Sequence, residues 1–385
     1  MKYFLTLIQL WVGFLSICAS YPKANIWIIP SVESPQVYRN YAQTSKVHLE
    51  MARGEVEHIQ LVFPSKVNEE YRFTFDRYLK GIQISARELK KMNGYYDALV
   101  PFKNQLKCTD TLTAVWITVQ CPSRVPVGKY HQTIKIEGSK HFTIQLDYNV
   151  HHTTIPLKSS IPITVGVENR CMTECLNDKE ADKERQRWVD FVLSYRMTPV
   201  FGTQITPERW QYEHSFSPWA WNDKRSIRLL NDRRYSCYML PFFTLSENEL
   251  ASLLCNIQKK GKLKESLFYI WDEPAYMEDY EQIKRKVNII RKYASDARIL
   301  TTFFCGPRNG PRKGDLYAVF DYLKHHIHVA TISLAPCKGN EEEVQHIRYK
   351  VPEGIDWWSY VCWQPGGNEP NFLLQMKGIQ QRAIM

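Results

Sequence analysis

The stretch Ser266-Leu-Phe-Tyr-Ile-Trp-Asp-Glu-Pro274 decides the fold of the C-terminal half of this chain. A short apolar run, rich in aromatic and β-branched residues, ends abruptly in two carboxylates and a proline. This pattern is typical of a buried parallel strand whose C-terminal end opens into a site. Adjacent carboxylates repel each other, so we expect one to stay ionised while the other carries a proton. Acid/base chemistry on glycosides needs that division.

The two carboxylates, Asp272 and Glu273, face opposite ways on a regular strand. Both reach one pocket only if the chain leaves β geometry at this point. Pro274 favours such a departure, because it restricts the backbone of Glu273 and cannot donate a hydrogen bond. The alternative is structural: Glu273 caps the following helix and Asp272 pairs with a basic residue.

The regions on both sides of this stretch alternate short apolar runs with amphipathic segments, which predicts β/α units around a parallel sheet. Strands are expected at residues 161–167, 199–202, 237–243, 266–271, 298–304, 328–334 and 355–361. The pattern predicts a TIM-like (β/α) barrel that lacks its last β/α unit. Open strand edges are costly, so we expect either a truncated gene product or another chain that covers the gap.

Helices of this half are indicated by apolar residues at helical spacing. After the first strand these are Trp188, Phe191, Val192 and Tyr195. Ser246 and Glu249 form a capping box before a helix with one leucine-rich face. An insertion at residues 204–234 is rich in tryptophan; its rings either wall a pocket or simply pack, and they are Trp210, Trp219 and Trp221.

The N-terminal half has an all-β pattern. Short β-rich segments at 59–63, 113–119, 133–136 and 142–150 are separated by turn signals such as Pro126-Val-Gly128. We expect an antiparallel β-sandwich of roughly seven to nine strands. The predicted domains are a β-sandwich at residues 21–157 and the barrel at residues 158–385.

Residues 1–20 are predicted to be a signal peptide. Lys2 is basic, residues 3–17 are apolar, and Cys18-Ala-Ser20 supplies small residues for cleavage. The alternative is an uncleaved membrane anchor, although a spanning helix needs roughly 20 apolar residues. The expected location is therefore the extracellular space or the lumen of the secretory pathway, with no membrane span after cleavage.

Composition narrows the class of partner. The formal charge of +10 comes from basic residues that are spread out rather than clustered, which argues against nucleic acid and leaves an acidic glycan as a plausible partner. Of the cysteines, Cys108 and Cys121 flank one strand and could bridge, and Cys171 and Cys175 are close enough for a local loop. Their spacing matches no zinc pattern, so no metal or cofactor is predicted.

A second cluster follows the last predicted strand. Trp357, Tyr360, Trp363 and Asn368 combine aromatic platforms for sugar C–H faces with hydroxyl and amide groups for hydrogen bonds. The alternative for Trp357 and Tyr360 is that they belong to the barrel core.

Both clusters resemble glycoside hydrolase family 123 and its uncharacterised relatives. The motifs are Phe268-Tyr-Ile-Trp-Asp-Glu-Pro274 and Trp357-Trp-Ser-Tyr-Val-Cys362, the latter followed by Pro365-Gly-Gly-Asn-Glu-Pro-Asn371. In the N-terminal half, Ala52-Arg-Gly-Glu-Val-Glu-His-Ile-Gln60 and Val125-Pro-Val-Gly-Lys-Tyr130 are similar to that family's β-sandwich. The resemblance spans nearly the whole chain after the predicted signal peptide.

The resemblance implies an exo-acting β-N-acetylgalactosaminidase that uses substrate-assisted retention and no cofactor. Carried over by motif, Glu273 is the general acid and then the general base, and Asp272 orients the 2-acetamido group. Tyr360 is the candidate for hydrogen-bonding the acetamido carbonyl. The expected substrate-binding residues are Trp271, Trp357, Tyr360, Trp363 and Asn368.

Two features depart from the family pattern. The eighth β/α unit is absent, and the sixth strand ends in Thr331-Ile-Ser-Leu-Ala-Pro336, where relatives place an acidic residue and a tryptophan. An inactive carbohydrate-binding relative or a non-functional fragment therefore stays open as the alternative to a hydrolase.

Overall fold

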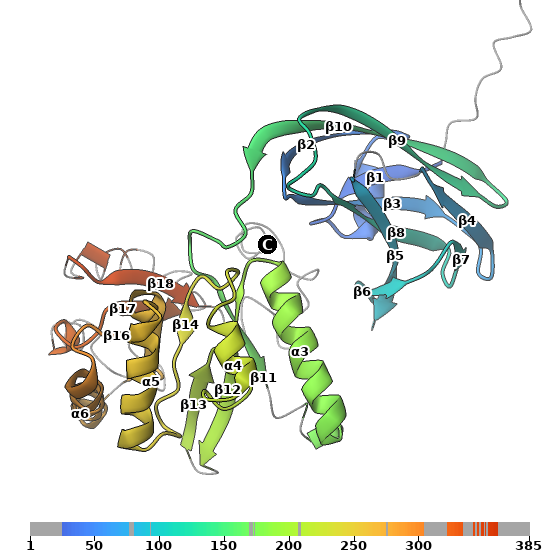
Figure 1. Cartoon of the computed structure of the whole chain (residues 1–385). Helices are drawn as coiled ribbons and strands as arrows, with labels where there is room; N and C mark the ends of the chain where they lie inside the picture. The colour runs from blue at the N-terminus through green and yellow to red at the C-terminus, as the bar shows by residue number, and fades with distance from the viewer. Residues whose placement is uncertain are drawn as a thin grey trace, which may run out of the picture. The chain divides into compact units, whose positions relative to one another are not determined.

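The computed structural model describes residues 25–360, except for 77–80, 93, 169–171, 173, 207–208, 275, 304–321, 334–341, 343–344, 346–347, 350 and 352. The described chain forms two compact units that meet in sequence between Ile155 and Pro156 (Figure 1). In these residues, no helix combines the length and the apolar character that crossing a membrane requires.

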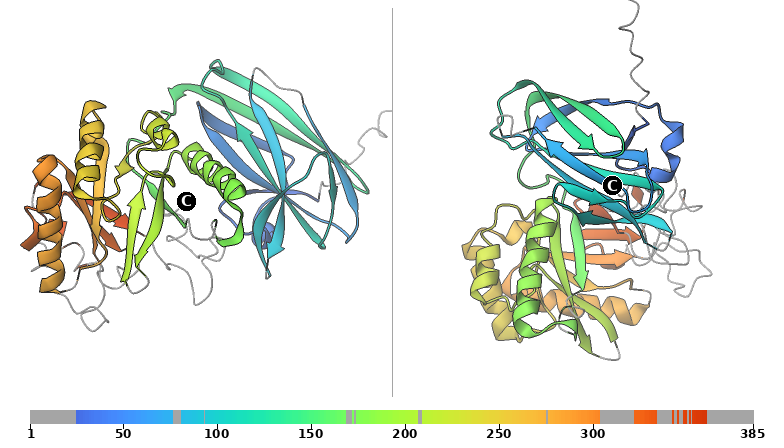
Figure 2. Two further views of the ribbon diagram at one scale, coloured as in Figure 1. Left: turned by 60° about the horizontal axis from the view of Figure 1, so that its bottom comes forward. Right: turned by 90° about the vertical axis from the view of Figure 1, so that its right-hand side faces the viewer.

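The first unit consists of two five-stranded sheets (Figures 1 and 2). One sheet has the order β1-β3-β8-β5-β6, with β1 at Trp27–Pro30, β3 at Val56–Pro64, β8 at Leu112–Gln120, β5 at Gln83–Met92 and β6 at Tyr95–Pro101. The other has the order β2-β10-β9-β4-β7, with β2 at Lys46–Arg53, β10 at His141–Thr154, β9 at Gly128–Glu137, β4 at Glu70–Phe75 and β7 at Gln105–Lys107. A 3-10 helix, η1, spans Pro35–Asn40.

The two sheets share one apolar core. On β9 and β10 the buried side chains alternate with exposed ones, which places Ile134 and Ile136 beside Ile144 and Leu146 in that core. The prediction of a β-rich first half is confirmed. The strands are more numerous than predicted because pieces such as β7 are too short to show a pattern, and β2 pairs with β10 in parallel rather than antiparallel.

The predicted bridge between Cys108 and Cys121 is wrong, since both thiols are free and buried. The two cysteines flank the nine residues of β8, which hold them roughly 30 Å apart. A disulfide needs its Cα atoms within about 7 Å. Cys175 is also free, and its suggested partner Cys171 lies outside the described residues.

The second unit contains parallel strands with helices between them. Its elements are β11 (Thr164–Glu168), α3 (Asp178–Ser194), β12 (Thr198–Thr206), β13 (Arg209–Ser215), α4 (Lys224–Leu229), β14 (Tyr238–Met239), α5 (Glu247–Lys259), η2 (Leu263–Glu265), β15 (Ser266–Trp271), α6 (Met277–Tyr293), β16 (Arg298–Phe303), β17 (Val329–Ser333) and β18 (Asp356–Tyr360). Strands β14-β15-β16-β17-β18 form one parallel sheet. Strands β11-β12-β13 form a second, mixed sheet, in which β11 and β12 are parallel. All seven predicted strands are present.

A barrel, however, is not confirmed: the larger sheet is a half-barrel, and in the described residues β12 does not pair with β14. Strand β13, from the insertion, pairs antiparallel with the edge of β12 that a barrel would give to β14. The chain just after β13 then contacts β14, where the Phe216 N–H donates to the Met239 carbonyl at 2.8 Å. The sequence pattern did not predict this strand inside the insertion.

The larger sheet of the second unit is apolar on both faces. On the helix side, Phe268 and Ile270 of β15 pack with Leu253 of α5 and Val287 of α6. On the inner side, Leu267 and Tyr269 of β15 belong to one buried cluster with Leu300 of β16. The other residues of this cluster are Val200, Cys237, Met239 and Val329. Such two-sided burial explains the continuous apolar runs of these strands.

The helices begin where local signals predict. Helix α5 starts at the capping box of Ser246 and Glu249, and its predicted leucine face is buried. On α3, by contrast, Val192 is buried but Trp188, Phe191 and Tyr195 are exposed and contact one another. Cys255, although it lies within the helical pattern of α5, is free and exposed.

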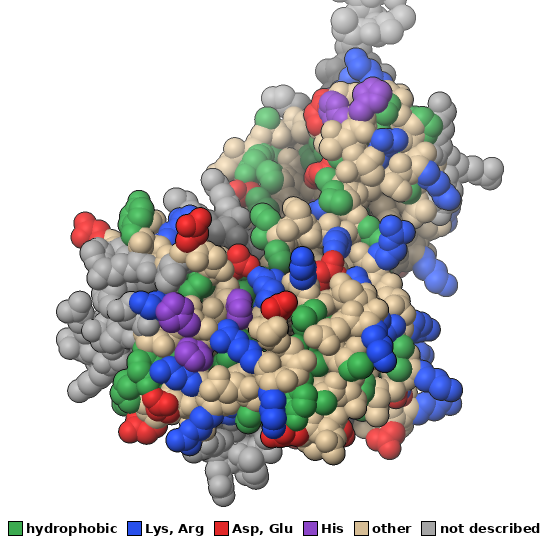
Figure 3. Space-filling view, turned by 60° about the vertical axis from the view of Figure 1, so that its left-hand side comes forward, with side chains coloured by type: hydrophobic (Ala, Val, Ile, Leu, Met, Phe, Trp, Pro, Cys, Tyr) green, Lys and Arg blue, Asp and Glu red, His purple; other side chains and the backbone are tan. Residues whose placement is uncertain are grey.

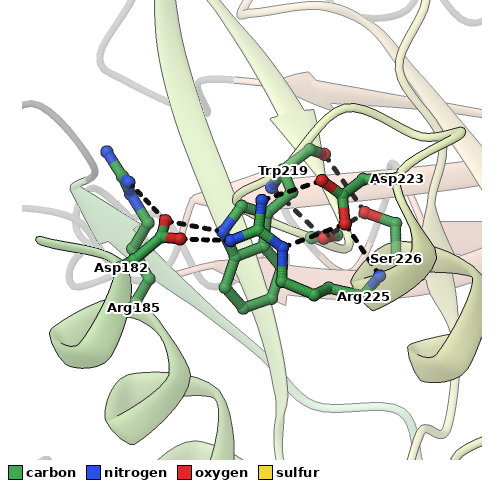
Figure 4. A network of polar contacts seen from close by, with 7 residues as sticks. Asp182, Arg185, Trp219, Asp223, Arg225 and Ser226 are labelled. Atoms are coloured by element: carbon green, nitrogen blue, oxygen red, sulfur yellow. Dashed lines mark hydrogen bonds and ion pairs between the residues drawn. The ribbon is translucent and has the colours of Figure 1, made fainter. Parts of the chain in front are cut away.

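A polar network fastens the insertion to α3 (Figure 4). Asp182 of α3 accepts a hydrogen bond from the Trp219 indole at 2.9 Å and forms an ion pair with Arg225 of α4. The Arg225 guanidinium lies over the Trp219 ring, 4.5 Å from its centre, and also pairs with Asp223. Trp219 is therefore a packing residue, as is Trp221, whereas the side chain of Trp210 lies outside the described part.

Charges of both signs are mixed on one face of the molecule (Figure 3). On the face that Figure 3 shows, lysine and arginine side chains lie among acidic and apolar ones, and the described residues of that face form no continuous basic stripe. A stripe of that kind is the usual footprint of a nucleic-acid partner.

Candidate functional site

The candidate site lies at the C-terminal end of β15, where Asp272 and Glu273 follow the strand. Glu273 has φ +48°, in the left-handed region that non-glycine residues rarely adopt. The pairing of β15 with β16 also shifts register between Tyr269 and Trp271. The chain therefore leaves β geometry here, as both carboxylates require if they are to serve one pocket. Strained backbone of this kind often marks a functional site.

Asp272 is held by two hydroxyl groups. Tyr269 donates to its Oδ1 at 2.6 Å, and Thr302, at the end of β16, donates to the same oxygen at 2.8 Å. Among the described residues, no hydrogen bond reaches Oδ2 of Asp272. Burial beside this carboxylate raises the pKa of the Tyr269 phenol well above its ordinary value, so the phenol keeps its proton and remains a donor.

Glu273 meets Tyr360, which comes from the end of β18. The Tyr360 hydroxyl donates a hydrogen bond to Oε1 of Glu273. Burial, and then this hydrogen bond, raise the pKa of Tyr360 far above the ordinary tyrosine value. The structure thus brings together three residues that the sequence analysis selected, from strands that lie far apart along the chain.

The structural alternative for the two acids does not hold. Helix α6 begins after Tyr276, and Asp279 accepts a hydrogen bond from the Tyr276 N–H in a capping box. Glu273 therefore does not cap this helix. Asp272 bonds to neutral hydroxyls rather than to a basic side chain.

The predicted aromatic residues divide between two faces of the sheet. Trp271 and Trp357 pack with the helix-side core, and Lys286 of α6 lies 4.1 Å from the centre of the Trp271 ring. This placement does not support their predicted role in binding substrate. Trp358 instead packs on the inner side, against the cluster of buried residues to which Tyr269 belongs. Trp363 and Asn368 lie outside the described residues, so their role stays a prediction.

Three residues of the site were not predicted from the sequence: Tyr269, Thr302 and His214. Strand alternation gave one signal, since a polar hydroxyl in the apolar run of β15 needs a partner when buried. His214 is the second-last residue of the unforeseen strand β13, and its ring centre lies 4.6 Å from that of Tyr269. No cluster of three or more histidine, cysteine or acidic residues suited to a metal ion occurs in the described part of the chain.

His214 gives the site a predicted pH dependence. Burial lowers its pKa to about 4, while the charge of Asp272 acts in the opposite direction. Between pH 6.5 and 4 the imidazole of His214 is protonated in the unfolded state but not in the folded state. Lowering the pH through this window therefore destabilises the fold. We expect this group to contribute a slope of about 1 kcal/mol per pH unit to the free energy of unfolding. Denaturant unfolding of His214→Gln across that window should show a smaller slope; an unchanged slope would contradict the prediction.

The arrangement as a whole can perform acid/base chemistry. It offers one carboxylate fixed by hydroxyl donors and a second beside a protonated tyrosine, at the C-terminal ends of parallel strands where such folds place their sites.

Comparison with solved structures shows a related fold. The chain is similar to a family 123 glycoside hydrolase from Clostridium perfringens, reported in a study of glycolipid glycan hydrolysis, with a TM-score of 0.56 and 13% identity over 90% of this chain and 73% of that one. A family 2 glycosyl hydrolase from Bacteroides cellulosilyticus gives a TM-score of only 0.28 at 11% identity, over 81% of this chain and 44% of that one, and carries no weight. No protein-family model and no curated protein matches the sequence.

The likeness to the family 123 enzyme is a likeness of fold. At 13% identity it does not assign the chain to that family. It supports a glycoside hydrolase-like architecture in which a β-rich unit precedes a unit of parallel strands.

Proposed function

We propose that the protein is a glycoside hydrolase that removes terminal β-linked N-acetylhexosamine, N-acetylgalactosamine in particular, by substrate-assisted retaining hydrolysis. One observation carries the proposal: Glu273 has a left-handed backbone, so the chain leaves β geometry at the point where two consecutive carboxylates must do so to face one site. Its setting in a glycoside hydrolase-like fold adds support.

The adjacent pair suits a mechanism in which the enzyme supplies no nucleophile. The acetamido oxygen of the substrate attacks the anomeric carbon, the bond to the leaving oxygen breaks, and Glu273 gives that oxygen a proton. Asp272 accepts a hydrogen bond from the acetamido N–H and stabilises the positive charge of the oxazolinium intermediate. Water then opens the intermediate and gives its proton to Glu273. Two carboxylates on opposite sides of the sugar, as in other retaining enzymes, are not needed.

We propose a role for Tyr360 in addition to its expected contact with the acetamido carbonyl. In the structure its hydroxyl donates to Glu273 rather than projecting alone as an acetamido ligand. We propose that Tyr360 holds Glu273 until substrate arrives.

We also propose that the natural substrate is a glycan of a glycoconjugate, which the protein meets outside the cell or in the secretory pathway. The glycolipid connection of the Clostridium neighbour supports this choice of substrate class.

The dependence on the acetamido group is a direct test. Aryl β-N-acetylgalactosaminide and β-N-acetylglucosaminide should be hydrolysed by the full chain, whereas the matching aryl β-galactoside and β-glucoside should react at least about 100-fold more slowly, because they lack the internal nucleophile. Replacing the acetyl group by trifluoroacetyl, a weaker nucleophile, should lower kcat as well. Equal turnover of galactoside and N-acetylgalactosaminide would contradict the mechanism.

Binding without turnover is the alternative outcome. Calorimetric titration of the folded chain with N-acetylgalactosamine separates the two cases. Sugar binding in the absence of any aryl glycoside hydrolysis would overturn the hydrolase proposal and favour a carbohydrate-binding protein.

A further inference from the structure

The hydroxyl of Thr302 connects the carboxylate of Asp272 to the backbone of Glu273. Its oxygen donates to Oδ1 of Asp272 at 2.8 Å and accepts the backbone N–H of Glu273 at 2.9 Å. Thr302 is only 8% exposed, so water does not readily substitute for it. One side chain therefore fixes both the Asp272 carboxylate and the strained backbone of its neighbour.

Tyr269 completes the arrangement. Its hydroxyl lies 3.0 Å from that of Thr302, and both hydroxyls donate to the same carboxylate oxygen. Both side chains come from rigid parallel strands, β15 and β16, rather than from loops. Two donors on Oδ1 orient the carboxylate and direct Oδ2 away from them.

We propose that Thr302 is a positioning residue that makes the two carboxylates one unit, and that Thr302 and Tyr269 occupy Oδ1 of Asp272 so that Oδ2 alone accepts the substrate N–H. This inference rests on the proposed function. It assigns to Thr302 a task that neither carboxylate can perform alone: fixing the left-handed turn and the acceptor together.

Each hydroxyl is removed by a near-isosteric substitution. Thr302→Val removes one donor to Asp272 and the acceptor of the Glu273 N–H. Tyr269→Phe removes only the other donor to Asp272. A misplacement of about 1 Å costs up to about 100-fold in rate. We therefore expect kcat/KM for an aryl β-N-acetylgalactosaminide to fall about 10- to 100-fold in each variant. The loss should be larger in Thr302→Val than in Tyr269→Phe. Thr302→Ser keeps the hydroxyl and should restore most of the activity.

Thr301→Val is the matched control. Thr301 is buried on the opposite face of β16, and its hydroxyl has no hydrogen-bond partner in the described structure. Thr301→Val removes the same hydroxyl group from the preceding residue. Because that hydroxyl lies on the other face of β16, turnover should stay within about twofold of the unmodified protein. Thermal unfolding of all variants reports whether a loss of activity follows from a loss of folding.

Two further measurements separate positioning from a general structural role. A 2-methylthiazoline analogue of the oxazolinium ion should bind Thr302→Val and Tyr269→Phe more weakly by about the same factor as the loss in kcat/KM. A dinitrophenyl leaving group, which needs no proton from Glu273, should reduce the Thr302→Val penalty toward that of Tyr269→Phe.

The outcomes are distinguishable. An active unmodified protein whose Thr302→Val variant matches Thr301→Val in turnover and thiazoline affinity overturns the positioning inference alone. A folded unmodified protein that neither hydrolyses the glycoside nor binds the thiazoline overturns the proposed function and this inference with it.

Discussion

Replacing Glu273 by glutamine should lower the turnover of an aryl β-N-acetylgalactosaminide by about 10²- to 10⁴-fold, the usual contribution of general acid–base catalysis. Glutamine keeps the side-chain length and can still accept a hydrogen bond from Tyr360, so the fold should be retained. Steady-state kinetics with the full chain measure the loss. It should shrink for an activated dinitrophenyl leaving group, because that departure needs no proton.

Glu278 offers the matched control for this substitution. It lies five residues further on, exposed in the first turn of α6. Glu278→Gln removes the same charge near the site without touching it, and turnover should be unchanged. Near-normal activity of Glu273→Gln, or an equal loss in both variants, would sink the assignment of Glu273 as the acid.

Phe268→Ala should destabilise the second unit by about 3–5 kcal/mol. Phe268 is 1% exposed, packs among the helix-side core residues, and lies on the strand that directly precedes both carboxylates. Truncation removes its buried area and leaves a cavity that the neighbouring strands and helices cannot fill. Chemical denaturation followed by tryptophan fluorescence would report the change.

Phe191→Ala provides the comparison. The same atoms are removed, but Phe191 is 54% exposed on α3 and contacts mainly Trp188 and Tyr195. Its loss should cost at most about 1 kcal/mol. Similar costs for the two substitutions would mean that burial of β15 does not control the stability of this unit.

The elements that the sequence predicted correctly are those whose signals lie within a few neighbouring residues. The capping box of α5 and the apolar run of β15 depend on neighbouring residues only, and both lie where they were expected. Strand β13 was missed because its partner edge on β12 became available only through the fold.

The aromatic residues of β18 show the limit for side chains. Consecutive tryptophans face opposite ways, and composition alone does not say which one faces inward. Trp357 was selected, but Trp358 packs on the inner side. The role of Thr302 could not be predicted from the sequence either, because it depends on the register that sets β16 beside β15.

The backbone of Glu273 places stability and chemistry in conflict. A glycine would adopt φ +48° without steric cost, whereas a glutamate stores strain there. A laboratory selection for heat resistance alone would therefore enrich glycine at position 273 and discard the carboxylate. Variant libraries of this protein need a selection for turnover alongside one for stability, or the site will be the first part to be lost.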